Sequence, residues 1–506
     1  MRRGFSTEKY LAAQTQAIKD RVAKFSGRLY LEFGGKLIED YHAARVLPGY
    51  DPDAKINILR ALQKDSDLVF CVSAHDIQRG RIRGDFGLTY DNATLKTIED
   101  LGERGLEVTA VIISRFTGEE SAQRFRDYLE NRGVRTYLQP EITGYPTDID
   151  RIVSDAGYGA YPYIQSDKHL IVVTGAGPGS GKMGTCLAQV YLDARAGRTS
   201  GYAKFETFPI WNLSLAHPVN LAYEAATADL ADKNMIDPFH LEAYGIEAVN
   251  YNRDVENFAI MRQIISRIIS HDNPMAQYRS PTDMGVNMAG AGIIDDAVVR
   301  EAGRQEIIRR FFRYNWEVLR RVENQETADR VRLLMSEQEI APTDRAVVQP
   351  ARRVAEDAEA QGEGHQGVFC GAAIELPDGT IVTGKNSPLL HAESAAIINA
   401  IKQLAQIPDG IHLLAPGVLE SISHLKIEEM GGRAPSLNVA ETLVCLAMSS
   451  ATNPTTQAAI RCLSRLRGCE MHTTHAPSRG DEDALRKLGI NFTTDARPVL
   501  HRFLVR

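Results

Sequence analysis

Apolar runs and amphipathic stretches alternate along the first third of the chain. Short apolar runs that predict buried strands lie at residues 28–33, 68–73, 107–114 and 135–138. Stretches with the helical apolar period lie between them, at residues 54–63, 92–104 and 119–131. Regular alternation of strand and helix is typical of a doubly wound parallel sheet. Residues 1–165 are therefore expected to form a Rossmann-like α/β domain, with segment 74–85 at the edge where ligands bind.

A strand, a glycine-rich loop and a helix follow one another in the next segment. The apolar run at residues 170–175 leads into the sequence Gly177-Pro178-Gly179-Ser180-Gly181-Lys182. Apolar residues at 183, 187, 190 and 191 then share one helical face. A bound phosphate needs backbone N–H groups at close range, a helix N-terminus and a nearby cation, and this segment offers all three. The segment is interpreted as a phosphate-binding loop; the alternative is a tight turn without a ligand.

The loop is similar to that of adenylate-kinase-like P-loop enzymes, but it departs from the pattern G-x-x-x-x-G-K-[ST]. Ala176 replaces the first glycine, and Met183 replaces the hydroxyl residue that meets magnesium. Thr185 is two residues further on and is the candidate substitute for that hydroxyl. The residues expected to bind the cofactor are Gly177, Gly179, Ser180, Gly181, Lys182 and Thr185. The expected cofactor is ATP or another nucleotide, accompanied by magnesium if Thr185 fills the missing role.

Polar side chains are dense between residues 206 and 254, after a strand expected at 202–211. This region is interpreted as the wall of a substrate site. The catalytic candidates are Asp237, His240, Arg253 and Asp254, as acid, base or anion contacts. For each of them the alternative is a turn former or a helix cap. An amphipathic helix or helix pair at 307–337 completes a second domain, residues 166–340, which joins the phosphate-binding loop to a helical extension.

A third α/β domain is expected over residues 341–506. A hairpin turns at Pro377-Asp378-Gly379, a helix begins at His391, and a strand is expected at 411–414. This outline resembles a cytidine-deaminase-type fold, in which His391 and Glu393 hold the positions of a zinc ligand and a proton-shuttling glutamate. The family's two cysteines are absent from the corresponding segment, residues 416–420. One histidine and at most one carboxylate fall short of three zinc ligands, so no zinc and no metal site is expected.

Composition limits the classes of function. The 506 residues are enough for about three domains, and 43% hydrophobic and 24% charged residues are ordinary for a globular protein. A net charge of −7 gives no broad attraction for nucleic acid or anionic lipid. The six cysteines form no C-x-x-C pair, as is typical of reduced thiols. No signal peptide or run of 18 apolar residues is present, so a cytoplasmic protein without nucleic-acid or membrane partners is expected. A homo-oligomer is compatible with the composition.

Over its full length the chain resembles a bacterial family catalogued as domain of unknown function 1846. The strings that carry this resemblance are residues 177–182, Phe205-Glu206-Thr207-Phe208-Pro209-Ile210-Trp211-Asn212-Leu213, residues 217–230, Met235-Ile236-Asp237-Pro238-Phe239-His240-Leu241-Glu242 and Ser280-Pro281-Thr282-Asp283-Met284-Gly285-Val286-Asn287. Some members are labelled ATP-dependent zinc protease. The glycine-rich loop agrees with the ATP part of that label, but the chain contains no H-E-x-x-H motif for the zinc part.

The leading hypothesis is a multidomain α/β enzyme that binds a nucleotide or another phosphorylated metabolite at residues 177–182. As a transferase or hydrolase, it would carry out phosphoryl or nucleotide chemistry on a small molecule. The first alternative is a nucleotide-sensing or scaffold protein without turnover. The second is a degenerate zinc hydrolase or deaminase.

Overall fold

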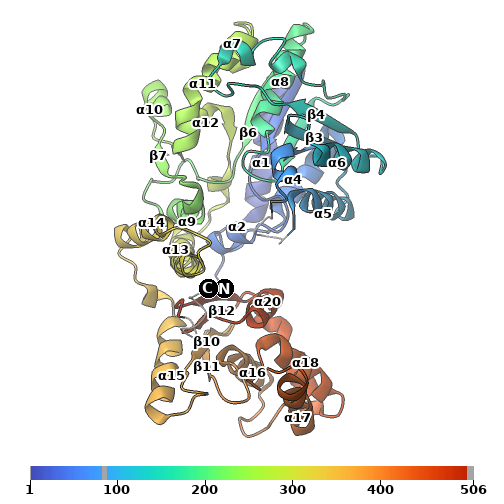
Figure 1. Ribbon diagram of the computed structural model, residues 1–506. Helices are drawn as coiled ribbons and strands as arrows, with labels where there is room; N and C mark the ends of the chain where they lie inside the picture. The colour runs from blue at the N-terminus through green and yellow to red at the C-terminus, as the bar shows by residue number, and fades with distance from the viewer. Residues whose placement is uncertain (1, 82–87, 433, 498–506) are drawn as a thin grey trace. The chain divides into compact units, whose positions relative to one another are not determined.

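The computed structural model describes residues 2–81, 88–432 and 434–497 (Figure 1). The chain divides into two compact units, an N-terminal unit up to Gly303 and a C-terminal unit from Arg304. The division falls inside helix α13 (Asp296–Leu319). Each unit combines helices with a sheet, which confirms the multidomain α/β class. Among the described residues, no helix has both the length and the apolar character needed to span a membrane.

A seven-stranded parallel sheet organises the N-terminal unit. Its strand order is β4-β3-β2-β5-β1-β6-β9, and every neighbouring pair is parallel. The strands are β1 (Arg28–Phe33), β2 (Ser66–Ser73), β3 (Val108–Phe116), β4 (Thr136–Pro140), β5 (Leu170–Gly175), β6 (Ser200–Phe205) and β9 (Gly285–Val286). The parallel sheet predicted from the alternating pattern is therefore confirmed.

The boundary expected between residues 165 and 166 runs through this sheet. Strand β5 pairs with β2 on one side and with β1 on the other, and β6 pairs with the far side of β1. The two domains expected at 1–165 and 166–340 are thus one folded unit up to Gly303. Which strands pair depends on contacts between distant segments, and these leave no mark in local periodicity.

Helices cover both faces of the sheet, since β1, β2 and β5 are buried along almost their whole length. The helices of this unit are α1 (Thr7–Ala23), α2 (Tyr41–Val46), α3 (Ala54–Leu62), α4 (Ala74–Gln78), α5 (Tyr90–Glu103), α6 (Glu120–Glu130), α7 (Ile149–Ile152), α8 (Lys182–Arg195), α9 (Pro218–Ala226), α10 (Pro238–Tyr244), α11 (Asn252–Ile268), α12 (Pro281–Met284) and the first part of α13. Figure 1 shows α4, α5 and α6 beside β3 and β4.

Two expected segments of the N-terminal unit need comment. The strand expected at 202–211 ends at Phe205, so Glu206 lies just beyond the carboxyl end of β6. Of the segment 74–85, the first residues form α4 directly after β2; residues 82–85 lie outside the described residues. Part of the polar region at residues 206–254 lies on a two-stranded antiparallel ribbon, formed by β7 (Asn234–Ile236) and β8 (Val249–Tyr251).

The C-terminal unit is a four-stranded mixed sheet between two helical layers. The strand order is β11-β10-β12-β13. Its elements are α14 (Gln325–Glu337), α15 (Val348–Gln361), β10 (Gly371–Glu375), β11 (Ile381–Lys385), α16 (Ala392–Ala405), α17 (Pro416–His424), α18 (Val439–Ser450), α19 (Pro454–Ile460), β12 (Glu470–Thr473), α20 (Arg479–Leu488) and β13 (Asn491–Thr494). Ala373 packs against α15 on one face, and Ala372 and Ile374 pack into a larger core with α16 and α18 on the other.

The hairpin and the helix that follows it lie where the sequence predicted them, as β10, β11 and α16. The strand expected at 411–414 is not formed; that segment is irregular and leads into α17. The relation of this unit to deaminases stays a prediction.

Candidate functional site

A cavity of about 760 Å³ opens at the carboxyl edge of the parallel sheet in the N-terminal unit. Ligands of open parallel sheets bind at this edge, and the volume suits a molecule of nucleotide size. The polar residues that line it include Glu32, Ser114, Arg115, Gln139, Lys182, Lys204, Glu206, Tyr251, Arg253 and Asp254. These residues come from segments spread over more than 200 positions, and the strand order brings them together.

The glycine-rich loop forms one wall of this cavity. Strand β5 ends at Gly175 and helix α8 begins at Lys182, which confirms the predicted order of strand, loop and helix. Gly179 and Gly181 have φ values of +73° and +91°, which favour glycine. A Cβ atom on Gly181 would lie 2.6 Å from Cβ of Ser114. Only glycine allows the backbone to approach β3 this closely.

The first turn of α8 leaves its amide groups free for a ligand. Within the described residues, the N–H groups of Gly181, Lys182, Met183 and Gly184 donate to no backbone acceptor, and no side chain caps the helix. The first N–H groups of any helix lack an intrahelical partner and carry a partial positive charge. The Lys182 ammonium donates to the carbonyl oxygen of Gly177 at 3.3 Å, so it is held beside the loop.

A second cation, Arg115, lies against the loop. One terminal nitrogen of its guanidinium is 3.7 Å from the position that a Cβ of Gly179 would occupy, and the same nitrogen donates to Oγ of Ser73 at 3.1 Å. Arg115 lies within an irregularity in the pairing of β3 with β4 and has a φ of +52°, an uncommon value for a residue other than glycine. Such irregularities often redirect side chains beside functional sites.

Two of the residues expected to bind the cofactor do not line the cavity. Ser180 is buried, and its Oγ lies 2.4 Å from where a Cβ of Gly175 would be, so it packs inside the turn. The hydroxyl of Thr185 donates to Oε1 of Gln139 at 2.8 Å. Gly177, Gly179, Gly181 and Lys182 do line the cavity. The role expected for Thr185 at a magnesium ion stays a prediction, and in this structure its hydroxyl is bound to Gln139 instead.

A charged cluster forms a second polar wall. The Lys204 ammonium lies 2.6 Å from Oε1 of Glu206 and 2.5 Å from Oδ2 of Asp254. Burial, helped by the neighbouring Asp254 carboxyl and opposed by Lys204, raises the pKa of Glu206 to about 7. Burial alone would lower the pKa of Lys204, but attraction by Asp254 and Glu206 outweighs it and the pKa is raised. The Lys204 ammonium therefore stays protonated between the two carboxyls. The Glu206 carboxyl can gain or lose a proton near neutral pH.

The four catalytic candidates divide into two pairs. Arg253 and Asp254 lie at the start of α11 and line the cavity; Arg253 pairs with Asp232 at 3.1 Å. Asp237 and His240 do not line it. Asp237 is fully buried and caps α10 by accepting the N–H groups of Phe239 and His240. Its other oxygen accepts the Thr282 hydroxyl at 2.7 Å.

His240 lies beside the same two helices and does not line the cavity. Its Nδ1 lies 3.0 Å from Oγ of Ser280, the residue that caps α12. Asp237 and His240 thus connect α10 to α12, away from the residues that line the cavity, and the catalytic role expected for them stays a prediction. The alternative of a helix cap is the one that the geometry of Asp237 supports.

Two family models together match nearly the whole chain. Residues 3–339 match the domain of unknown function DUF1846, N-terminal, and residues 343–499 match the domain of unknown function DUF1846, C-terminal. The chain belongs to the DUF1846 family. It is similar to a UPF0371 protein of Clostridium botulinum (strain Alaska E43 / Type E3), with 49% identity over 496 residues. A UPF0371 protein of Clostridium tetani (strain Massachusetts / E88) is 47% identical over 495 residues, and each alignment covers 98% of both chains.

Sequence reasoning missed several cavity residues of this DUF1846 chain. Lys204 and Glu206 could have been found, because two charged residues two positions apart at the end of an apolar strand are a recognisable pattern. Arg115 directly follows the segment 107–114 that was expected to be a strand. Gln139 gave no signal, because an isolated glutamine at the end of a short strand is common. Its role depends on Thr185, 46 positions away.

Proposed function

We propose that the N-terminal unit binds a phosphorylated small molecule of nucleotide size in the 760 Å³ cavity. The phosphate would lie against the amide groups of residues 181–184, between the side chains of Lys182 and Arg115. The observation that carries this proposal is the convergence of free helix-end amides and two cations on one loop that opens into a large cavity.

Charge favours an anion at this loop. A helix N-terminus stabilises a negative charge by about 0.3–1 kcal/mol when exposed and by up to about 2 kcal/mol when partly buried. Each charge-assisted hydrogen bond adds about 1.5–3 kcal/mol. Gln139 also lines the cavity, and its buried Nε2 has no hydrogen-bond partner among the described residues. An acceptor on a ligand would satisfy this unpaired donor.

The rest of the ligand would face the cluster of Lys204, Glu206 and Asp254. A carboxyl with a pKa of about 7 can act as a general acid or base at neutral pH. This cluster makes proton transfer to or from the ligand's non-phosphate part the reaction we favour. Hydrolysis at a magnesium ion of the Walker type is less well supported, because Met183 follows the lysine and the Thr185 hydroxyl is bound to Gln139.

Calorimetric titration with a panel of nucleotides and phosphorylated metabolites tests the binding step. Lys182→Ala should weaken binding of the tightest ligand at least tenfold, which requires only about 1.4 kcal/mol, and Arg115→Ala should also weaken it. Lys19→Ala on the exposed side of α1 removes the same charge away from the cavity and serves as the control. Equal affinity in all four proteins would contradict the proposal.

A binding protein without turnover is the alternative, and the Glu206 carboxyl separates it from an enzyme. In an enzyme that uses this carboxyl, Glu206→Gln keeps ligand affinity within a few-fold and abolishes conversion of the ligand, as followed by mass spectrometry. Steady-state release of phosphate or diphosphate would instead indicate phosphoryl chemistry. If the ligand is neither converted nor cleaved, the protein is a sensor or scaffold.

A further inference from the structure

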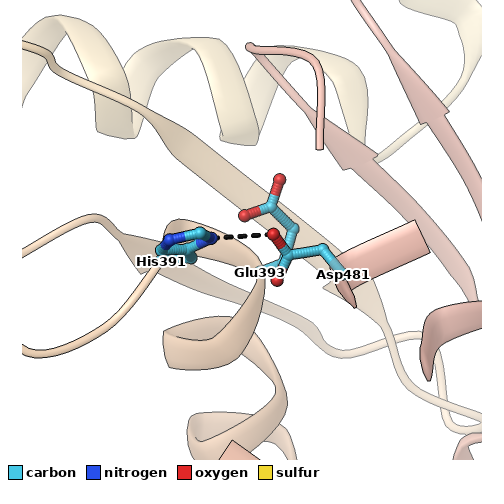
Figure 2. A group of neighbouring side chains, drawn as sticks. All are labelled: His391, Glu393 and Asp481. Carbon is cyan, nitrogen blue, oxygen red and sulfur yellow. Dashed lines mark hydrogen bonds and ion pairs between the residues drawn. The ribbon is translucent and has the colours of Figure 1, made fainter. Parts of the chain in front are cut away.

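Three side chains of the types that bind metal ions converge in the C-terminal unit. They are His391, Glu393 and Asp481, and one ligand atom from each lies within 4.8 Å of the other two. Figure 2 shows the three side chains pointing toward one another, with the imidazole of His391 facing the Asp481 carboxyl. The cluster shares no residue with the cavity of the N-terminal unit, and the inference drawn from it is independent of the function proposed for that cavity.

Two helix N-termini hold the cluster in place. His391 is the N-cap residue of α16, and Glu393 lies in the first turn of that helix. Asp481 lies in the first turn of α20, where its carboxylate accepts the N–H of Ser478 as part of a capping box. Oδ1 of Asp481 also accepts the N–H of Val439 at 2.7 Å. The carboxylate is therefore fixed before any ligand arrives, as in metal sites whose ligands are oriented by outer hydrogen bonds.

The other two ligands are oriented as well. Nδ1 of His391 lies 2.7 Å from Oδ2 of Asp481, and Oε1 of Glu393 accepts the Thr473 hydroxyl at 2.9 Å. Tetrahedral ligand atoms around a first-row ion at about 2.0–2.1 Å lie about 3.3 Å apart. The cluster thus needs only a small outward movement of the imidazole, which is about one-third exposed at 32%. That exposure also gives an ion a path from solvent.

The charge balance of the cluster favours a cation. Asp481 and Glu393 are 0% and 5% exposed, so both carboxyls are buried. Among the described residues, neither lies within 4 Å of a lysine or arginine nitrogen, and the one ion pair is that between His391 and Asp481. Glu393 has no ion-pair partner among the described residues, and a buried carboxylate without a paired cation is costly; coordination of a metal ion is one of the ways in which proteins compensate it.

We propose that His391, Glu393 and Asp481 bind one divalent first-row transition-metal ion. Imidazole with carboxylate is a common ligand set for such ions, and three protein ligands leave a coordination position open to solvent. No metal was expected from the sequence because one histidine and at most one carboxylate could be counted. Asp481 supplies the third ligand atom from 88 positions beyond Glu393, which removes the premise of that expectation.

The test is metal binding by the full-length chain after dialysis against a chelator, without nucleotide. Co²⁺ and Zn²⁺ are added separately, and bound metal is measured by elemental analysis after gel filtration. We expect one equivalent of metal per chain and d–d absorption bands from Co²⁺ that report its coordination. His391→Ala and Glu393→Gln should each weaken binding at least tenfold, because the first removes the imidazole ligand and the second replaces a charged carboxylate ligand with a neutral amide.

The controls locate the ion. Glu356→Gln, at an exposed position of α15, makes the same chemical change as Glu393→Gln outside the cluster and should bind metal normally. Glu206→Gln makes this change in the carboxyl cluster of the N-terminal unit, and it should also leave metal binding unchanged. Far-UV circular dichroism and the melting temperature establish that each variant is folded. Absence of bound metal at millimolar Co²⁺, or binding that survives both His391→Ala and Glu393→Gln, would overturn the proposal.

Discussion

Replacing Glu206 by glutamine should change how the stability of the N-terminal unit depends on pH. Glu206 is 9% exposed, and its pKa is raised from the ordinary value of 4.5 to about 7. In the unfolded chain the carboxyl loses its proton near pH 4.5, whereas in the folded chain it keeps the proton up to about pH 7. Between these values the unfolded state binds fewer protons, so stability falls as pH rises.

The size of the fall follows from the pKa difference. A difference between 4.5 and about 7 corresponds to about 3 kcal/mol, and this is the largest loss that Glu206 can cause. Glutamine has nearly the same shape but does not titrate, and Lys204 keeps its partner Asp254. We therefore expect Glu206→Gln to change stability little at pH 4.5 and to stabilise the unit by up to about 3 kcal/mol at pH 8.

Tryptophan fluorescence during urea denaturation can measure this in the full chain. The chain has two tryptophans, Trp211 in the N-terminal unit and Trp316 in the C-terminal unit. In a Trp316→Phe background the signal reports the N-terminal unit alone. Glu120→Gln, whose parent side chain is 86% exposed, is the control. Parallel pH profiles of stability for the Glu206→Gln variant and its parent would contradict a raised pKa of Glu206 in the folded chain.

Two further predictions concern buried hydrogen bonds. Thr185→Val should lower the free energy of unfolding of the N-terminal unit by about 1–3 kcal/mol, because Gln139 Oε1 loses its donor inside the fold; urea denaturation of the Trp316→Phe background measures this, and an unchanged midpoint would contradict it. Arg345→Met should destabilise the C-terminal unit by about 3–5 kcal/mol, since the buried guanidinium binds Glu470, Thr493 and two backbone carbonyls. Arg332→Met, at a side chain 57% exposed, should leave the melting temperature nearly unchanged.

Local patterns predicted local structure well. The strands of the parallel sheet, the turn after β5 and the helix after it follow from apolar period and glycine content, which act over a few residues. The hairpin of β10 and β11 was predicted for the same reason. The domain boundary expected at 165 falls inside one sheet, because β5 inserts between β2 and β1, and no local signal records which strands pair.

The candidate site was only half predicted, for a related reason. Asp237 precedes Pro238, and an aspartate before a proline is a common start of a helix. This pattern favours a helix-capping role for Asp237 over a catalytic one. Arg253 and Asp254 were identified because they lie in a dense polar stretch. Arg115 and Gln139 join them only through the packing of β3 and β4 beside α8. Asp481 meets Glu393 in the same long-range way, through α20.

The phosphate site that we propose at the N-terminus of α8 can be observed in a complex. A crystal structure of the protein with the tightest ligand of the titration panel tests this most directly. We expect phosphate density within hydrogen-bond distance, about 2.7–3.2 Å, of the amide nitrogens of residues 181–184, with the Lys182 ammonium turned from Gly177 onto the phosphate. A ligand whose phosphate binds elsewhere, while this loop stays closed on itself at saturating concentration, would contradict it.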